Sequence, residues 1–468
     1  MDSSGKSFNP NKHLKEQFVS NLTGSSMLET FALSALVPVL VLLRQSFCCA
    51  CMTDVMNKKT SVNKNEDGAI GFKNMGAYMS MLAIDFLLIV VPIVLSFTVL
   101  SEWIYTVALM LTSLLIFFVR TKRYKHVAEK GNDSNSLRSN VSSYRVTMML
   151  VTCFSILAVD FRIFPRRFAK TETYGTSLMD LGVGSFVFAN SLVSRQARGI
   201  QTVKLKNIIQ STSPLLLLGF GRLVSTAGIH YQVHVGEYGV HWNFFFTLAA
   251  VSILTSVINI SPRYCGALGL SILVGYEVIL MKGGLNAYLL SNERGKDIIS
   301  QNKEGIFSIF GYLGLYLVGV HLGNYLIFGD SGAILRTNKW AKSRVYFLSI
   351  FFWLLTMLLD EYVEEVSRRM CNVGYVTFVL AQNLQVLAIL MEADRIPGYK
   401  MSLLEQAINR NLLGTFLLAN ILTGLVNMFV ETLFVSTLTS IWVLIGYALL
   451  LSFTMGLADF CGIRFKFW

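Results

Sequence analysis

The stretch AVDFRIFPRRFAKTETYGTSLMDLGVG, residues 158–184, places a dense group of charges between two apolar runs. It holds three arginines, a lysine and several carboxylates, and apolar character resumes at Leu181. Charged side chains beside long apolar runs are costly in a membrane unless they bind a partner or face a polar cavity. The stretch therefore predicts a membrane protein in which this loop between two spans carries the chemistry.

The composition of the whole chain supports a membrane protein. Of the 468 residues, 53% are hydrophobic and 15% are charged, whereas soluble domains carry about 25% charged residues. The mean hydropathy is +0.54. A spanning helix needs about 20 mostly apolar residues, and runs of that kind occur at 30–50, 78–98, 99–119, 145–162, 178–194, 210–228, 241–260, 264–281, 306–328, 345–360, 372–391, 411–430 and 437–458. We expect an all-α, polytopic integral membrane protein with about 13 transmembrane helices, because these runs lack the polar faces of soluble helices.

The connections between the runs indicate one integral membrane domain, residues 1–468, because no polar connection exceeds about 30 residues. Residues 1–27 are polar, with no removable signal peptide expected. The segments 52–76 and 120–143 are rich in Asn, Lys, Ser and Gly and are expected to be mobile cytosolic loops. Residues 329–344 form a third polar insertion.

Basic residues predict the orientation of the chain. With the amino end in the lumen, the cytosolic connections collect about 24 Lys and Arg against about 13 on the other side. The segment 1–27 is therefore expected to be lumenal and the carboxyl end cytosolic. On this topology the 158–184 loop is lumenal, and its cations oppose the general trend, which suggests an anionic ligand.

Two carboxylates, Asp160 and Asp180, bracket the cationic part of the loop. Asp160 could form an ion pair with Lys170, or act as a base that Lys170 orients; the residues alone leave both alternatives open. A partly buried carboxylate beside a cation is suited to accept the proton of an alcohol.

The cations of the loop suggest a phosphate site. Phe164 precedes Pro165, so the preceding helix is expected to end there. If a helix resumes, Arg166 and Arg167 share one face with Lys170, and guanidinium groups bind phosphate oxygens in pairs. Anchoring of these cations at lipid head groups is the alternative interpretation.

A second polar group lies in HVGEYGVHWNFFF, residues 234–246, just before an apolar run. It supplies Glu237, His241, Trp242 and Asn243. Its glycines oppose the helix that would align metal ligands, so no metal is expected, and hydrogen bonds in a polar cavity are the favoured interpretation. His241 is an alternative base.

Three further polar positions stand at the ends of apolar runs. Asn302 and Glu304 come just before the run 306–328, and Arg368 and Arg369 come before the run 372–391. Asn420 and Asn427 are spaced to share one helical face, where they line a cavity or bond neighbouring helices. The seven cysteines form no disulfide framework or zinc pattern, and P-loop, GxSxG, HExxH and dinucleotide-binding motifs are missing from the sequence.

Several long motifs resemble a known family. They are LAVDFRIFPRRFAKTETYGTSLMDLGVGSFVF, EYGVHWNFF, EGIFSIFGY, VSRRM and LLANILTGLVN, followed by the KFW end. Together they are similar to the PIG-W family, the inositol acyltransferases of glycosylphosphatidylinositol-anchor synthesis, from about residue 14 to the end. The pattern departs from that family at Arg162, where the family usually has proline, and at Lys303, where it usually has arginine.

The resemblance implies an enzyme of the endoplasmic reticulum membrane. Such an enzyme moves a fatty acyl chain, typically palmitoyl, from acyl-CoA to the inositol 2-hydroxyl of glucosaminyl-phosphatidylinositol. Membrane lipids surround it, and acyl-CoA is a co-substrate, so we expect no cofactor, no nucleic-acid partner and no obligate protein partner.

The resemblance also implies roles for individual residues. Asp160 takes the hydroxyl proton, while Lys170 orients it or stabilises the oxyanion formed on the thioester carbonyl. The expected substrate-binding residues are Arg166 and Arg167 for phosphate, Asp180 or Glu237 for the glucosamine ammonium, and Trp242, Asn243, Asn302 and Glu304. Two alternatives remain: His241 as the base, or a transporter of an anionic lipid or metabolite, which would favour repeated halves that the sequence lacks.

Overall fold

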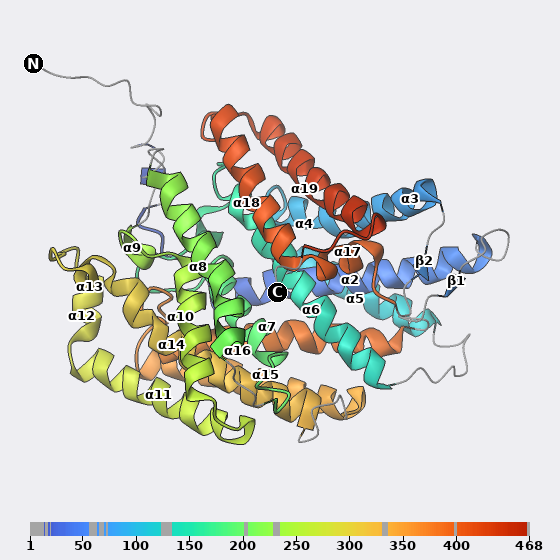
Figure 1. The fold of residues 1–468 in the computed structure, drawn as a ribbon. Coiled ribbons are helices and arrows are strands. Elements are labelled where there is room, and N and C mark those ends of the chain that lie inside the picture. The colour runs from blue at the N-terminus through green and yellow to red at the C-terminus, as the bar shows by residue number, and fades with distance from the viewer. Residues whose placement is uncertain are drawn as a thin grey trace, which may run out of the picture.

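A computed structural model of the chain describes residues 14, 17–18, 20–55, 63–64, 70–71, 74–122, 133–200, 205–227, 235–329, 336–396 and 400–465. These residues form a bundle of helices, with a short hairpin of β1 (Asn63–Lys64) and β2 (Ile70–Gly71) near one end (Figure 1). Backbone hydrogen bonds that stay within each helix satisfy the polar groups that a membrane cannot. The all-α polytopic class predicted from the sequence is confirmed.

The first half of the bundle consists of α2 (Met27–Val55), α3 (Met75–Asp85), η1 (Phe86–Val90), α4 (Val91–Ser96), η2 (Ser101–Trp103), α5 (Ile104–Lys122), α6 (Asp133–Ala158), η3 (Arg166–Phe168), α7 (Leu181–Leu192) and α8 (Leu205–Ala227). The second half consists of α9 (Val235–Tyr238), α10 (Phe244–Ile258), α11 (Pro262–Lys282), α12 (Leu285–Leu290), α13 (Ile298–Gln301), α14 (Lys303–Gly323), η4 (Asn324–Phe328), α15 (Asn338–Tyr362), α16 (Val373–Leu390), η6 (Met391–Arg395), α17 (Leu403–Arg410), α18 (Leu412–Phe429) and α19 (Thr437–Phe460).

The number of spans differs from the predicted thirteen. Within the described residues, 10 helical segments are long and apolar enough to cross a membrane. Three further apolar helices are shorter: Leu181–Leu192, Ile208–Val224 and Phe244–Ile258. At about 1.5 Å per residue, α7 rises only about 18 Å, against a hydrocarbon core of about 30 Å. The predicted apolar runs are therefore helical, but a count of thirteen spans is not confirmed.

The polar insertions are shorter than predicted, because the neighbouring helices extend into them. In the range 52–76, α2 continues to Val55, and residues 56–62, 65–69 and 72–73 lie outside the described residues. In the range 120–143, α6 already begins at Asp133, and residues 123–132 lie outside. Of the segment 1–27, residues 1–13, 15–16 and 19 lie outside.

Helix α16 forms the centre of the bundle, because 89% of its most apolar 18-residue stretch is buried. Its polar side chains bond neighbouring helices: Gln382 accepts a hydrogen bond from Ser34, and Asn383 accepts one from Tyr144 at 2.7 Å. Hydrogen bonds of this kind join helices where water is absent. The core therefore ties α2 and α6 to α16.

Charged contacts gather at two opposite ends of the bundle. One end, here called the site end, holds the start of α2 at Glu29, the end of α6 and the start of α14 at Glu304. At the other end, Asp459 of α19 accepts hydrogen bonds from Tyr78 and Arg410. Helix α2 thus begins at the site end and α19 finishes at the opposite end.

Candidate active site

The α6–α7 loop, residues 159–180, is folded into the site end rather than lying on its surface. Phe161, Phe164 and Phe168 are each 0% exposed, so their burial anchors the loop. Irregular backbone at membrane depth is tolerated where protein surrounds it. The helix expected after Pro165 is only the turn η3, so the loop cations do not share a helical face and each finds its own partner.

Asp160 lies just beyond the end of α6 and is half-buried. Its Oδ2 accepts a hydrogen bond of 2.7 Å from Nδ2 of Asn427, in the last turn of α18. Burial lowers the pKa of Arg166 to about 10, and the charge of Asp160 opposes that fall. Asp160 therefore combines partial burial, a fixed orientation and a neighbouring cation.

Arg166 and Arg167 are both engaged by protein oxygens. Nη2 of Arg166 donates to the carbonyls of Val159, Phe161 and Phe164 at 2.8, 3.1 and 3.0 Å. Arg167 pairs with Glu29 at 2.9 Å and with Glu102 at 2.7 Å. Arg166 therefore closes the turn that follows α6, and Arg167 ties the loop to α2 and to η2, just before α5.

Lys170 pairs with Glu237 rather than with Asp160. Lys170 Nζ lies 2.5 Å from Glu237 Oε1, and its side chain is 39% exposed. Arg368 Nη2 lies 3.7 Å from the same oxygen. Burial raises the pKa of Glu237, but Lys170 and Arg368 outweigh it and hold that pKa at about 2. The carboxylate is therefore charged and holds both cations in place.

Asp180 is saturated by protein donors. Its Oδ1 accepts from Arg368 Nε at 2.8 Å and from the Thr171 amide at 3.1 Å. Its Oδ2 accepts from the hydroxyls of Ser177 at 2.8 Å and Thr171 at 3.0 Å. Burial raises the pKa of Asp180, and Arg368 opposes that rise. This arrangement locks the second half of the loop onto the segment before α16.

The residues around α10 act mainly through backbone contacts. Asn243 caps α10, with its Oδ1 accepting from the amides of Phe245 and Phe246 at 3.0 and 3.3 Å. Asn302 Oδ1 accepts from the backbone amide of His241 at 2.8 Å. His241 itself is exposed.

Aromatic packing and a buried ion cluster join α14 to its neighbours. The indole of Trp242 donates to Thr247 at 2.9 Å and packs against Gly305, where an added Cβ would lie 2.3 Å from the ring. Glu304 is fully buried and accepts from Arg294 at 2.7 Å and from Arg369 at 2.9 Å. Glu304 therefore balances two cations within the protein.

Arg368 and Asn427 stand out among the residues that the sequence indicated without a role in the site. Arg368 bridges Asp180 and Glu237, and Asn427 orients Asp160. For Arg368 the available signal was a cation directly before an apolar run, where it needs a buried partner. For Asn427 the signal was its helical spacing from Asn420, but this spacing does not indicate which residue Asn427 contacts.

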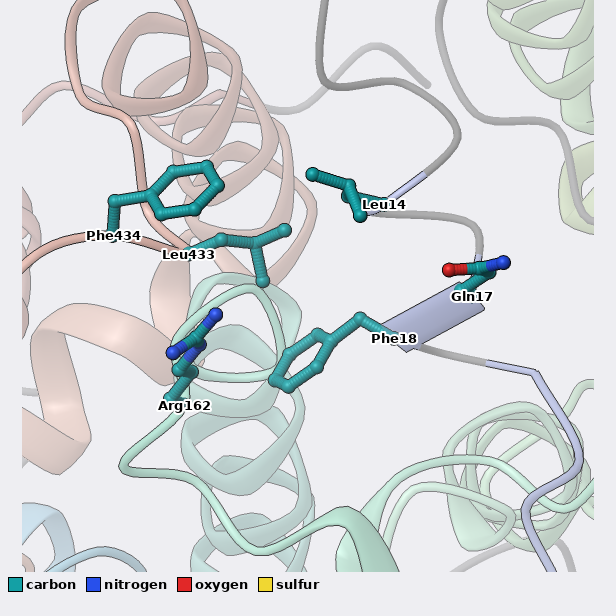
Figure 2. Close-up of a pocket in the computed structure, with 6 residues that line it drawn as sticks. All are labelled: Leu14, Gln17, Phe18, Arg162, Leu433 and Phe434. Atoms are coloured by element: carbon teal, nitrogen blue, oxygen red, sulfur yellow. The ribbon is translucent and has the colours of Figure 1, made fainter.

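A pocket of about 360 Å³ opens at Arg162, two residues after Asp160. Figure 2 shows Arg162 and the rings of Phe18 and Phe434 facing one space, together with Leu14, Gln17 and Leu433. The Arg162 guanidinium lies 5.7 Å from the centre of the Phe434 ring. Arg166, which neighbours Asp160, stacks on Phe18 at 3.9 Å, so the pocket wall adjoins the candidate base. Among the residues described, no group of three His, Cys, Asp or Glu side chains is placed to hold a metal ion.

The fold and the site define a polytopic, all-α membrane protein with a polar loop folded into one end of its bundle. The chain belongs to the GWT1 family, whose model matches residues 11–458. This confirms the family that the sequence motifs indicated.

Relatives of known name match along nearly their whole length. The "Phosphatidylinositol-glycan biosynthesis class W protein" of Dictyostelium discoideum is 33% identical over 512 residues, covering 98% of this chain and 99% of the relative. The "GPI-anchored wall transfer protein 1" of Aspergillus oryzae is 36% identical over 501 residues, covering 94% and 96%. An uncharacterized protein of Arabidopsis thaliana is 54% identical over 435 residues, covering 92% and 99%.

Proposed function

We propose that the protein transfers a fatty acyl chain, palmitoyl in the first instance, from acyl-CoA to the inositol 2-hydroxyl of glucosaminyl-phosphatidylinositol. Membership of the GWT1 family and the names of the relatives, which refer to glycosylphosphatidylinositol anchors, support this role. Its place is the endoplasmic reticulum membrane, with the amino end lumenal and the carboxyl end cytosolic.

The observation that carries the mechanism is the hydrogen bond from Asn427 to Asp160. Asp160 takes the proton of the 2-hydroxyl while the inositol oxygen attacks the thioester carbonyl carbon. A C–O bond forms, the C–S bond breaks, and the coenzyme A thiolate leaves with the proton that Asp160 releases. A carboxylate oriented in this way contributes about 10²–10⁴-fold as a general base.

Lys170 stabilises the oxyanion that forms on the thioester carbonyl. The Lys170 side chain is 39% exposed, and its ammonium is held by Glu237, which stays charged at neutral pH because its pKa is about 2. A cation that is fixed before the reaction stabilises developing negative charge without reorganisation. The thioester carbonyl then faces the Lys170 ammonium, whose position is fixed by Glu237 and not by an ion pair with Asp160.

The glucosamine ammonium has two candidate partners, Glu237 and Asp180. The side chain of Glu237 is 19% exposed and that of Asp180 is 1% exposed. Asp180 already accepts hydrogen bonds at both oxygens. We therefore favour Glu237 for the ammonium.

The test is incubation of the purified protein with palmitoyl-CoA and glucosaminyl-phosphatidylinositol, followed by mass analysis of the lipid. Product with one added palmitoyl chain is expected. Asp160→Asn should lose about 10²–10⁴-fold of the turnover, with an unchanged melting temperature. Normal turnover by Asp160→Asn at matched amounts of protein would remove Asp160 as the base.

The same assay separates the alternatives. His241→Ala is expected to retain most activity, because the described contact of His241 runs through its backbone amide and its side chain is exposed. Loss of turnover in His241→Ala with normal turnover in Asp160→Ala would favour His241 as the base. Movement of the lipid across vesicles without acyl transfer would favour a transporter.

A further inference from the structure

The four cations of the α6–α7 loop differ in what holds them. Arg166 donates to backbone carbonyls, Arg167 pairs with two carboxylates, and Lys170 pairs with Glu237. Arg162 is exposed and makes no hydrogen bond or ion pair with the part of the chain that the structure describes. Its described contact is with the face of Phe434. Of the loop cations, Arg162 therefore has a guanidinium with edges open to an external anion.

Arg162 also lines the pocket that it shares with Phe18, Leu433 and Phe434 (Figure 2). Pockets that bind small molecules measure about 300–1,000 Å³, and this one measures about 360 Å³. A guanidinium stacked on an aromatic ring still presents its N–H groups in the ring plane, where they bind phosphate oxygens in pairs. Phe18, Leu433 and Phe434 supply apolar walls beside this guanidinium.

We propose that Arg162 binds the phosphodiester of the acceptor lipid in the pocket formed by Phe18, Leu433 and Phe434. The inference rests on the proposed function and, because the family usually has proline at this position, it assigns an acceptor contact that is particular to this chain. In phosphatidylinositol the phosphate and the 2-hydroxyl occupy adjacent ring carbons, so the residue that binds phosphate must lie close to the base. Arg162 is separated from Asp160 by Phe161 alone.

This assignment moves the phosphate contact away from the two arginines that the sequence favoured. To bind phosphate, Arg167 would have to release Glu29 and Glu102. Three carbonyls hold Nη2 of Arg166, and its Nη1 is buried inside the protein, away from an external phosphate. Removing a partner from a paired buried charge is costly. Arg162 binds an anion without breaking a described ion pair or hydrogen bond.

The experiment measures steady-state kinetics of the full-length protein in mixed micelles, with glucosaminyl-phosphatidylinositol varied at saturating palmitoyl-CoA, and then the reverse. Arg162→Ala should raise KM for the acceptor about 10–100-fold, the effect of losing a charge-assisted contact. Its kcat and its KM for palmitoyl-CoA should stay within about two-fold of wild type. Arg162→Lys, which keeps the charge but not the paired geometry, should recover part of the loss.

The matched control is Arg198→Ala. Arg198 is also exposed and stacks on a phenylalanine, Phe328, at 5.3 Å, but it lies in the connection after α7. Its removal should leave both KM values unchanged, which separates a local effect of Arg162 from a general loss of positive charge.

Three results would overturn the inference: an unchanged acceptor KM in Arg162→Ala, a rise in the KM for palmitoyl-CoA instead, or an equal effect of Arg198→Ala. The Asp160→Asn variant keeps this failure distinct from failure of the proposed function. If Asp160→Asn is inactive while Arg162→Ala has an unchanged acceptor KM, the phosphate-binding role of Arg162 is wrong and the proposed function is not contradicted. Binding of the acceptor to Asp160→Asn, weakened by an added Arg162→Ala, would support the assignment without turnover.

Discussion

The Asn427 side-chain amide donates a 2.7 Å hydrogen bond to the Asp160 carboxylate across 267 residues of sequence. The contact joins the last turn of α18 to the loop that follows α6. Because Asn427 is neutral, it orients the carboxylate without neutralising its charge. The amide thus holds one carboxylate oxygen of Asp160 in a defined orientation.

Asn427→Ala should therefore lower kcat while leaving the fold intact. A hydrogen bond to a charged group contributes about 1.5–3 kcal/mol, so we expect about a 10–100-fold loss of kcat if the bond matters fully in the transition state. Asn420→Ala is the control on the same helix: Asn420 is exposed and donates to the Phe416 carbonyl at 2.7 Å. Equal losses in both variants would argue against a positioning role for Asn427.

Glu304→Ala should destabilise the protein strongly. Its removal leaves Arg294 and Arg369 without their shared carboxylate, and breaking a buried ion pair costs about 3–5 kcal/mol. Thermal unfolding in detergent should show a clearly lower melting temperature. Glu102→Ala, in which a 72% exposed partner of Arg167 is lost, should cost less than about 1 kcal/mol. A stable Glu304→Ala variant with a raised acceptor KM would instead support the substrate-binding role predicted from the sequence.

The lowered pKa of Glu237 predicts how the stability of the protein depends on acid pH. Its pKa falls from an ordinary value of 4.5 to about 2 in the folded protein, so the unfolded chain binds the proton more readily. The stabilisation is complete above about pH 4.5 and is lost as the pH falls from there toward about 2. The difference in melting temperature between wild type and Glu237→Gln should thus be constant from neutral pH to about pH 5 and then shrink. A difference that stays constant down to pH 3 would contradict this account.

Gly311 marks a close approach between α14 and the segment before α16. A Cβ added there would lie 2.0 Å from the Cys371 carbonyl oxygen, a backbone atom that cannot move aside easily. Gly311→Ala should therefore lower the melting temperature and the yield of folded protein. Gly275→Ala on α11 is the matched change, since an added Cβ meets nothing within 4 Å. It should be neutral or stabilising by up to about 1 kcal/mol, because alanine favours helices.

Much of the fold could be predicted from the chain because the length of an apolar run is a local property. Each predicted apolar run is helical, yet α7 is too short to span, which the run 178–194 did not reveal. Helix α7 begins directly after Asp180, whose carboxylate is held by Arg368, 188 residues away in the sequence. A contact between residues so far apart in the sequence cannot be predicted from the local pattern of apolar residues.

The structure brings several residues of the predicted site to one end of the bundle, and it gives them partners that the sequence did not predict. The α6–α7 loop, Asp160, Lys170 and Glu237 all belong to the site end, as their spacing around apolar runs suggested. The pairing of Lys170 with Glu237 depends on how α9 packs against the loop. Such a choice between several nearby carboxylates requires the packed bundle.

The sequence by itself determined that this is a polytopic helical membrane protein of the GWT1 family, because hydropathy and long motifs are written along the chain. The tertiary structure alone decided which loop charges are neutralised and that Arg162 faces an open pocket. The physical reason is that the partner of a side chain depends on which helix ends lie next to each other. The packing of the whole bundle determines this arrangement.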